Sequence, residues 1–572
     1  MREPVDLLVG PAAQVATPVG AKPRRPPAGP DQGRLRVIPD GAVAIRGDRI
    51  VAVGPYAELA ARYEPAQVLD ATGCTVLPGF VDPHTHLCFA GWRAEEFEWR
   101  LAGASYQEIL AAGGGILDTV RKTRAASEVE LAVTLRRRLL ELLRMGTTTV
   151  EVKSGYGLTT ADELKMLRAI RRAADPSDDL DGAWPPASGD PRQGLRWRLG
   201  TNRPKGEGTG RGPIPDAARA ARRAERAPVG GGWEQRAGDG QADPAGGLRD
   251  DRGDDGRAGG RRDRPAETAG PTPGDRDDGR AEPAGGTPGD GSGWRAQPAG
   301  ITSGQPAGIT SGDAGGRRTG AVGDGPDLRP VLPDVVATFL GAHAVPPEYR
   351  GHPDTYVDLV IEAMLPEVAR QGLAEYADVF CERGVFDLAQ TRRIVEAAKR
   401  LGFRIRLHVD ELAPLGGAGL AAAVGAVSAD HLLHVRDEDI PRLREAGTVA
   451  TLLPGTAFFL REPYAPARKL IAAGVPVALA TDYNPGSHPA GSMPLVMAIA
   501  CVGMGMTPAE ALVAGTLGAA WALERADRVG SLEPGKQADL VVIEAPSYQH
   551  LAYRLGTVPV VAVVKAGQVV RV

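Results

Sequence analysis

The chain has 572 residues, of which 42% are hydrophobic, so it can bury a large core and is expected to hold more than one domain. Its formal net charge of −4 argues against a nucleic-acid or anionic-membrane surface as its partner. No stretch approaches 18 apolar residues, so no membrane-spanning helix is expected. The four cysteines form no CxxC pair and the N-terminus lacks a secretory apolar region, which together predict reduced thiols in a cytoplasmic protein.

Both ends of the chain are rich in short runs of β-type residues. The run 41–54 predicts a hairpin that turns at Gly47, and the runs 535–543 and 560–570 resemble it and are joined by a polar loop. We therefore expect both termini to build one small β-sandwich domain, with its two parts at residues 1–75 and 523–572.

Helix-period segments alternate with apolar runs through the middle of the chain. Helices are predicted at 128–145, 161–174, 356–371, 388–401 and 508–522. Strands are predicted at 147–152, 335–340, 377–381, 405–408, 449–453 and 477–481. This alternation is typical of a parallel (β/α)8 barrel of the TIM type, which we expect in two parts, residues 76–175 and 331–522.

A stretch of foreign composition, residues 176–330, separates those two parts. It holds 36 of the 75 glycines, only ten Val, Ile and Leu residues, and a tandem octapeptide at 297–312. Such a composition cannot build a core and predicts a disordered insert. Three interpretations stay open: an inert linker, a segment that contacts protein or RNA, and GC-rich sequence that was misassembled or read in the wrong frame.

Two histidines one residue apart end an apolar, β-branched run at residues 75–86. Side chains alternate along a strand, so His84 and His86 should point the same way. Two further strand-like runs end in His408 and in Asp482. Because the carboxyl ends of barrel strands meet at one face, these four residues predict a metal site that keeps open positions for chemistry.

These features resemble the amidohydrolase superfamily and, within it, the imidazolonepropionase family. The resemblance covers nearly all of the chain except the insert, and the motifs that carry it are residues 78–86, 89–97, 146–157, 338–343, 408–411, 428–431 and 480–487. It implies an enzyme in which metal-bound hydroxide hydrolyses the ring C–N bond of 4-imidazolone-5-propanoate, giving N-formimidoyl-L-glutamate in histidine degradation.

The resemblance also implies one divalent metal ion held by His84, His86, His408 and Asp482. Three imidazoles and a carboxylate suit Zn²⁺, our first expectation, and also Fe²⁺. Binuclear members of the superfamily add a carboxylated lysine on a middle strand. The run 378–384, where that lysine is expected, has none, so a single ion is favoured.

Three residues are candidates for proton transfer. Glu411 is placed to carry a proton between the attacking water and the departing ring nitrogen, His431 to orient that water or the oxyanion, and Asp482 to share the role of base. The sequence does not rank them. The alternatives are a carboxylate in a surface loop for Glu411 and a core histidine for His431.

The substrate-binding candidates suit a planar anion. Arg93 is expected to clamp the propionate carboxylate with a bidentate fork, against the alternative of a solvated arginine paired with Glu95 or Glu96. The remaining candidates, for the carboxylate, the ring or the product backbone, are Tyr156, His343, Glu411, Asn484, Gly486 and Ser487.

Two other functions compete with this one. A deaminase of cytosine or guanine type shares the metal set and the His408–Glu411 pair, but a neutral base needs no carboxylate clamp. A non-catalytic scaffold usually loses metal ligands, whereas all four candidates are present here. The partners expected are a small-molecule substrate and a second copy in a homodimer, although the sequence does not fix the oligomeric state.

Overall fold

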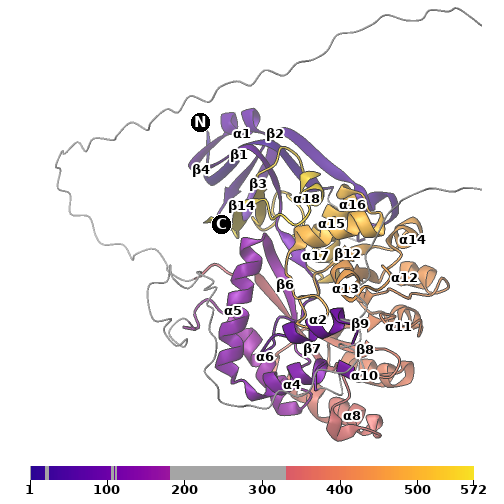
Figure 1. The fold of residues 1–572 in the computed structure, drawn as a ribbon. Coiled ribbons are helices and arrows are strands. Elements are labelled where there is room, and N and C mark those ends of the chain that lie inside the picture. Colours follow the sequence, from indigo (N-terminus) through magenta and orange to yellow (C-terminus); the bar gives the residue numbers. More distant parts are fainter. Residues whose placement is uncertain (1, 20–24, 105–107, 110–112, 181–329, 572) are drawn as a thin grey trace, which may run out of the picture. The chain divides into compact units, whose positions relative to one another are not determined.

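The structure is a computed structural model that describes residues 2–19, 25–104, 108–109, 113–180 and 330–571. The predicted insert lies, over residues 181–329, outside the described residues. The described parts contain a seven-stranded mixed sheet and an eight-stranded parallel sheet (Figure 1). Every helix among them is too short or too polar to cross a membrane.

Both termini contribute to the seven-stranded sheet, which confirms the expected small β domain. Its strands run in the order β15-β14-β13-β4-β1-β2-β3 in one continuous sheet. The predicted hairpin is present, with Ala44 opposite Ala52. The strands are β1 (Glu3–Pro18), β2 (Leu35–Arg46), β3 (Arg49–Pro55), β4 (Tyr63–Pro78), β13 (Leu540–Ile543), β14 (Val560–Lys565) and β15 (Gln568–Arg571).

The eight parallel strands form the expected barrel and follow one another in chain order from β5 to β12. They are β5 (Phe80–Asp82), β6 (Thr147–Lys153), β7 (Asp334–Ala342), β8 (Tyr376–Cys381), β9 (Arg404–Val409), β10 (Ser428–His431), β11 (Val449–Leu452) and β12 (Val477–Leu479). A parallel bridge between Thr85 and Asp482, just beyond β5 and β12, closes the ring.

The composition of the apolar run before the two histidines predicts a single strand, but the structure divides this run between two strands. Residues up to Pro78 pair within the terminal sheet as β4, and the chain then enters the barrel as β5. The break falls at Gly79, where a Cβ would overlap the Thr148 side chain. His84 and His86 consequently lie beyond the end of β5, in a segment that Asp482 holds by backbone hydrogen bonds.

Helices follow the barrel strands and lie outside them (Figure 1). Those after the early strands are α2 (Ala94–Leu101), α4 (Ile116–Ala125), α5 (Glu128–Arg144), α6 (Thr160–Ala174), α8 (Pro353–Leu359), α9 (Leu365–Gln371) and α10 (Leu388–Arg400). The later ones are α11 (Gly417–Val424), α12 (Ile440–Ala446), α13 (Pro454–Leu460), α14 (Ala467–Ala472), α15 (Met493–Met504), α16 (Pro508–Val513) and α17 (Ala519–Ala522). The helix α1 (Tyr56–Arg62) lies against the terminal sheet, and α18 (His550–Tyr553), between β13 and β14 in the chain, packs against α15.

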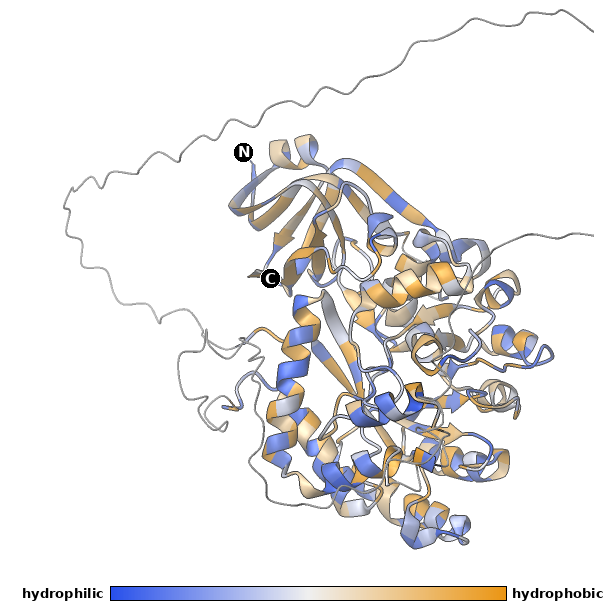
Figure 2. Cartoon of the chain, in the orientation of Figure 1, coloured by the Kyte–Doolittle hydropathy of each residue, from blue (hydrophilic) through white to orange (hydrophobic). Residues whose placement is uncertain are grey.

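Local sequence explains where the helices begin and how they face the barrel. Ser127 and Glu130 form a capping box at the start of α5, and Asp387 with Gln390 does the same for α10. Apolar and charged residues alternate around α5, so one face packs inward (Figure 2). The predicted helices at 356–371 and 508–522 each contain a π-helical turn, η3 (Val360–Met364) and η4 (Ala514–Gly518), which periodicity alone does not reveal.

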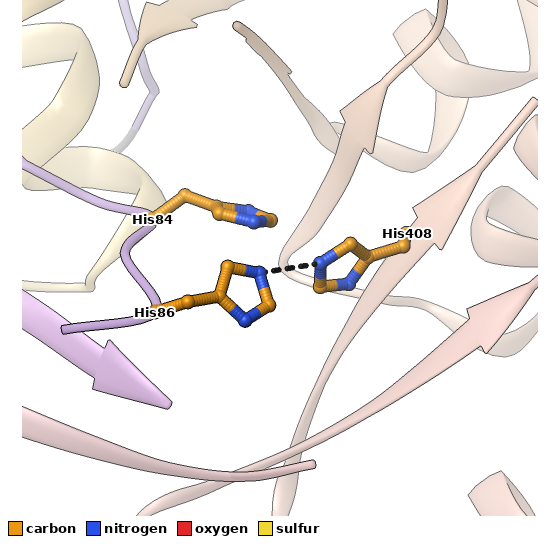
Figure 3. A group of neighbouring side chains, drawn as sticks. All are labelled: His84, His86 and His408. Carbon is orange, nitrogen blue, oxygen red and sulfur yellow. Dashed lines mark hydrogen bonds between the residues drawn. The ribbon is translucent and has the colours of Figure 1, made fainter. Parts of the chain in front are cut away.

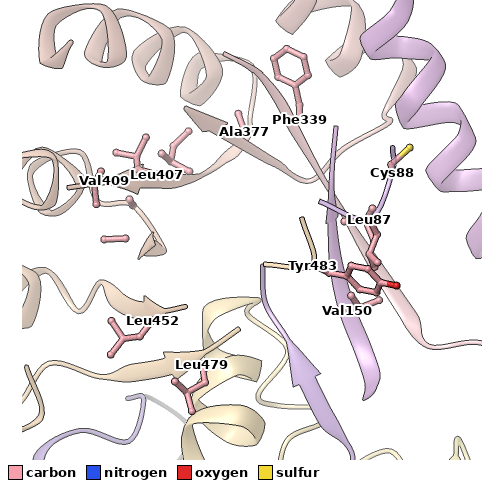
Figure 4. Packing of buried hydrophobic residues seen from close by; sticks show 14 of the residues in the cluster. Leu87, Cys88, Val150, Phe339, Ala377, Leu407, Val409, Leu452, Leu479 and Tyr483 are labelled. Atoms are coloured by element: carbon pink, nitrogen blue, oxygen red, sulfur yellow. The ribbon is translucent and has the colours of Figure 1, made fainter. Parts of the chain in front are cut away.

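The main core fills the space between strands and helices. Leu87, Phe339, Leu407 and Leu479 belong to this cluster, and each is at most 1% exposed (Figure 4). A second cluster, which includes Leu7, lies within the terminal sheet. The outward-facing residues of the barrel strands thus make the core, which leaves the inward-facing positions at their carboxyl ends for polar groups.

Candidate active site

Three buried histidines meet at the carboxyl end of the barrel (Figure 3). His84 and His86 follow β5, and His408 lies in β9, four strands further around the barrel. Their ligand nitrogens lie within 4.8 Å of one another, and the Nε2 atoms of His86 and His408 are 3.3 Å apart. None of the three is more than 2% exposed.

Two buried aspartates orient two of these rings. His84 Nδ1 lies 2.7 Å from Asp430 Oδ2, and His408 Nδ1 lies 3.0 Å from Asp378 Oδ2. A carboxylate only accepts hydrogen bonds, so the contact with Asp430 places the His84 proton on Nδ1 and leaves the lone pair on Nε2, whereas Asp378 lies beside His408 Nδ1 without hydrogen-bond geometry. His84 Nε2 therefore presents a metal-binding lone pair to the interior of the barrel.

The Asp482 carboxylate lies beside His84 and His86. Its backbone is left-handed, with φ of 70°, and it donates to the His84 carbonyl and accepts from the His86 amide. Hydroxyl groups of Thr456 and Ser487 donate to Oδ2 at 2.7 and 2.5 Å. The other oxygen, Oδ1, lies 3.5 Å from His86 Nε2 and 3.8 Å from His84 Nε2.

The donor set fits a divalent cation. His84 Nε2 and Asp482 Oδ1 are buried and have no hydrogen-bond partner among the described residues. Lone pairs that face one another in a dry interior are costly unless a cation lies between them. Burial, followed by nearby positive charge, lowers the pKa of His84 well below its ordinary value, so this ring stays neutral as a ligand must. The histidine triad is a buried metal site.

A lysine is buried beside this site. Lys153, at the end of β6, is fully buried and donates to Glu151 Oε1 at 2.8 Å and to Asp378 Oδ2 at 2.9 Å. Burial alone would lower the pKa of Lys153, but Asp378 and Glu151 outweigh it and raise it. Carboxylation of a lysine needs a neutral amine, so these two ion pairs favour the single metal ion expected from the sequence.

Glu411 and His431 lie next to one another on the same face. Glu411 Oε2 is 3.5 Å from His431 Nε2, and neither ring nitrogen of His431 has a hydrogen-bond partner among the described residues. Burial, followed by Asp482, raises the pKa of Glu411 well above its usual range. Burial lowers the pKa of His431. The pair therefore offers a proton-carrying carboxyl beside a neutral imidazole. Glu411 lies in the loop after β9 but is buried rather than at the surface, and His431 is buried without a hydrogen-bond partner among the described residues.

Arg93 is buried and already paired. Its Nε and Nη2 atoms donate to Glu96 at 2.8 and 2.5 Å, and its side chain is only 11% exposed. The Nη1 side of the guanidinium packs against Gly486, where a Cβ would overlap it. The pairing with Glu96 foreseen as the alternative is thus present, but in a buried setting. One bidentate edge is taken by Glu96, and the Nη1 atom lies against Gly486.

Tyr156 and His343 lie beside His86. The ring centroid of Tyr156 is 6.0 Å from that of His86, and His343 stacks on His86 at 4.9 Å. His343 Nδ1 donates to the Gly155 carbonyl at 3.0 Å, and burial lowers the pKa of this ring to about 3. The Tyr156 hydroxyl is buried with no hydrogen-bond partner among the described residues, and burial raises its pKa. Together they present an uncharged donor and an acceptor.

The segment after Asp482 mainly shapes the site. Asn484 Oδ1 accepts from the Gly486 amide at 2.9 Å, and Ser487 holds Asp482. His488 Nδ1 lies 2.5 Å from the Thr481 carbonyl. In this structure Gly486 provides the space for Arg93, and Ser487 orients the candidate metal ligand.

Sequence reasoning missed the residues that support the site. Asp378, Asp430, Thr456, Lys153 and Glu382 are all buried beside it. Glu382 Oε2 accepts the backbone amides of Glu411 and Leu412 at 3.0 and 2.9 Å. Charged residues inside otherwise apolar runs, such as Asp378 in β8, are the signal that could have found them, because a lone charge is rarely buried without a partner.

Comparisons with known proteins agree with this geometry. A family model described as "Amidohydrolase family" matches residues 299–570, and a second model of that description matches residues 67–112. The model "Imidazolonepropionase-like composite domain, bacteria" matches residues 41–63.

Curated relatives match over nearly the whole chain. Imidazolonepropionase of Symbiobacterium thermophilum is 41% identical, with 99% of this chain and 97% of the relative covered. Imidazolonepropionase of Geobacillus kaustophilus is 40% identical over 94% and 91%, and that of Herpetosiphon aurantiacus is 37% identical over 98% and 97%.

Solved structures share the fold at low identity. Guanine deaminase of E. coli is 13% identical with a TM-score of 0.54, covering 98% of this chain and 99% of that one. Atrazine chlorohydrolase of Arthrobacter aurescens, complexed with zinc, is 15% identical with a TM-score of 0.51, covering 98% and 94%. At such identities the likeness shows the fold alone.

Proposed function

Because the chain belongs to the imidazolonepropionase family of amidohydrolases, we propose that it hydrolyses 4-imidazolone-5-propanoate to N-formimidoyl-L-glutamate. The observation that carries this proposal is an identity of about 40% over nearly the full length of curated imidazolonepropionases. The site residues support it, since Tyr156 and His343 beside His86 offer uncharged hydrogen-bonding groups for a planar ring and Arg93 offers a cation for its carboxylate.

We assign the metal site to His84, His86, His408 and Asp482, with Zn²⁺ as the resident ion and Fe²⁺ as the alternative. The ion, when bound, supplies the Lewis acid that activates water for attack on the ring carbon between the two nitrogens. The protein residues then have to bind the ring, hold it in place and move protons.

Glu411 is assigned as the proton carrier. Its backbone amide donates to Glu382, which fixes the chain at this residue, and its carboxyl lies beside His431 in a setting that favours the protonated form. A proton on Glu411 can pass to the departing ring nitrogen, which must be neutralised as the C–N bond breaks. His431, neutral and without a partner, is placed to donate one N–H to the developing oxyanion. Asp482 keeps Oδ1 in the site and shares the role of base.

The substrate carboxylate is assigned to Arg93. Glu96 fixes the guanidinium through one edge, so the Nη1 side can bind propionate without losing its orientation. The Tyr156 hydroxyl is placed to donate to the ligand, and His343 Nε2 can accept from a ring N–H because its Nδ1 is committed to Gly155. Asn484, Gly486 and Ser487 complete the wall of the site.

An absorbance assay with metal analysis tests this function. The full-length protein, loaded with zinc, should consume 4-imidazolone-5-propanoate and release N-formimidoyl-L-glutamate, and chelation should stop it. Faster turnover of guanine or cytosine would assign the chain to the deaminases instead. The cytoplasmic location expected from the sequence stays part of this proposal, and the four cysteines are all free thiols in the structure.

A further inference from the structure

A group of buried charges lies directly behind the histidines. Lys153 and Glu151 of β6, Asp378 of β8, and Arg406 and Asp430 of β9 and β10 are each at most 1% exposed. Burying this many charges costs stability unless each ion is paired. All five are paired with one another, and the arrangement divides into two arms that end at different metal-site histidines.

The first arm runs through Lys153. Its ammonium joins Asp378 Oδ2, which lies 3.0 Å from His408 Nδ1. It also joins Glu151, whose Oε2 accepts the Thr85 amide at 3.1 Å. Thr85 lies between His84 and His86 in the chain. The Lys153 ammonium is therefore linked through Glu151 to the segment after β5 and through Asp378 to His408 of β9.

The second arm runs through Arg406. Its Nη2 lies 3.2 Å from Asp430 Oδ2, the oxygen that contacts His84 Nδ1. The same guanidinium donates to the carbonyls of Pro83 and Ala522 at 2.7 Å. Backbone contacts therefore anchor Arg406, whereas the Lys153 ammonium is held by two carboxylates alone.

We propose that Lys153 is a positioning residue of the metal site, holding Asp378 against the backbone amide and the Nδ1 side of His408 and the Thr85 backbone in register with β6. Without the ammonium, Glu151 and Asp378 become neighbouring buried carboxylates that repel each other. Asp378 then turns away from His408, and the Nε2 lone pair of that ring is no longer aimed at the ion. This inference rests on the proposed function, because it concerns the affinity of the site for its metal.

Zinc affinity of the full-length protein, measured by competition with a chromophoric chelator, tests the proposal. Lys153→Met should weaken zinc binding about 10- to 100-fold, the usual effect of losing a residue that orients a ligand. Lys536→Met is the matched control, because Lys536 is also buried and donates to Ser531 and the Ala526 carbonyl in a part of the chain away from the histidines. Its melting temperature should fall while its zinc affinity stays within about twofold of wild type.

A double-substitution cycle identifies the arm through which Lys153 acts. In an Asp378→Asn background, Lys153→Met should weaken zinc binding by less than about threefold further, since the carboxylate it steers is gone. In an Asp430→Asn background the two losses should multiply. Wild-type zinc affinity in Lys153→Met, or full multiplication with Asp378→Asn, overturns the proposal. If Lys153→Met does not fold, Lys153→Gln decides by the same measurement. A wild-type protein that binds no zinc would instead overturn the metal site itself, and with it this inference.

Discussion

The interiors of the barrel and of the terminal sheet are equally dry but chemically opposite. Within the sheet, Leu7, Val43 and Leu540 belong to one buried apolar cluster, and the buried ion pair of Lys565 with Asp539 lies at the end of β14. Behind the barrel histidines, carboxylates and cations fill the space. Apolar burial stabilises a fold by about 25 cal/mol per Å², whereas buried ion pairs contribute little or cost stability. The sheet interior therefore contributes mainly stability, and the barrel interior holds the groups that carry out chemistry.

Removal of a metal-site histidine should have the largest effect on activity. His84→Ala, or chelation of the wild-type protein, should reduce turnover to background, because the activated water disappears with the ion. The free energy of unfolding of the metal-free protein should fall by about 1–3 kcal/mol, since His84 is fully buried and its Nδ1 gives up the hydrogen bond with Asp430. Turnover, bound zinc and urea unfolding check this, with His434→Ala as the control. Near-normal activity of His84→Ala in chelated buffer would refute the assignment.

Glu411→Gln should have the second-largest effect on activity, through a loss of kcat. Loss of a general acid typically costs about 10²- to 10⁴-fold in kcat. Zinc content should stay at the wild-type level, because Glu411 contacts His431 and not the histidine triad. Steady-state kinetics with metal analysis separates the two effects. A fall in zinc content that matches the fall in kcat would move Glu411 from proton transfer to metal binding.

Arg93→Lys should have an intermediate effect. Losing a charge-assisted pair costs about 1.5–3 kcal/mol, or roughly 10- to 150-fold, and should appear in KM for 4-imidazolone-5-propanoate. An amide analogue without the carboxylate should be turned over at nearly the wild-type rate. Arg121→Lys, an exposed arginine paired with Asp118, is the control. Equal losses on both substrates would show that Arg93 only supports Glu96.

The sequence was sufficient for the parts of the molecule that are periodic. Alternating helix and strand patterns predicted β6, β7, β8 and β9 to within two residues at each end, because packing against helices forces apolar residues onto one face. It did not give β10, whose four residues include Asp430 and His431 and so look polar. Nor did it place the break at Gly79, since both neighbouring segments are apolar strands and only their pairing partners differ.

The candidate site was predictable where residue type alone indicates chemistry. Histidines and an aspartate at strand ends were recognisable, and the structure brings them together. Pairings between distant residues were not, because nothing in the sequence links Lys153 to Asp378 or Arg93 to Gly486. Those contacts are determined by which strands lie side by side.

A substitution in the terminal sheet should have the opposite pattern to the histidine variants. Leu540 is fully buried, so Leu540→Ala should lower the free energy of unfolding by about 2–5 kcal/mol. At temperatures where the variant stays folded, kcat, KM and zinc affinity should equal those of wild type. Val561, which is 41% exposed on β14, gives the control Val561→Ala with little change in stability. A large loss of kcat in the folded Leu540→Ala protein would mean that the two interiors are coupled.

Deletion of residues 181–325, with a short linker in their place, should have the smallest effect of all. Residues 176–330 contain only ten Val, Ile and Leu residues, too few to add a core of their own. The residues just before the deletion keep contacts of their own, because Arg136 donates to the Asp178 carbonyl at 2.6 Å and Leu180 is buried. Kinetics and urea unfolding of the deleted protein should match wild type. A deletion that unfolds the barrel or lowers kcat more than about threefold would show that this stretch supports one of the two interiors, and a second deletion that also removes Leu180 should be clearly less stable.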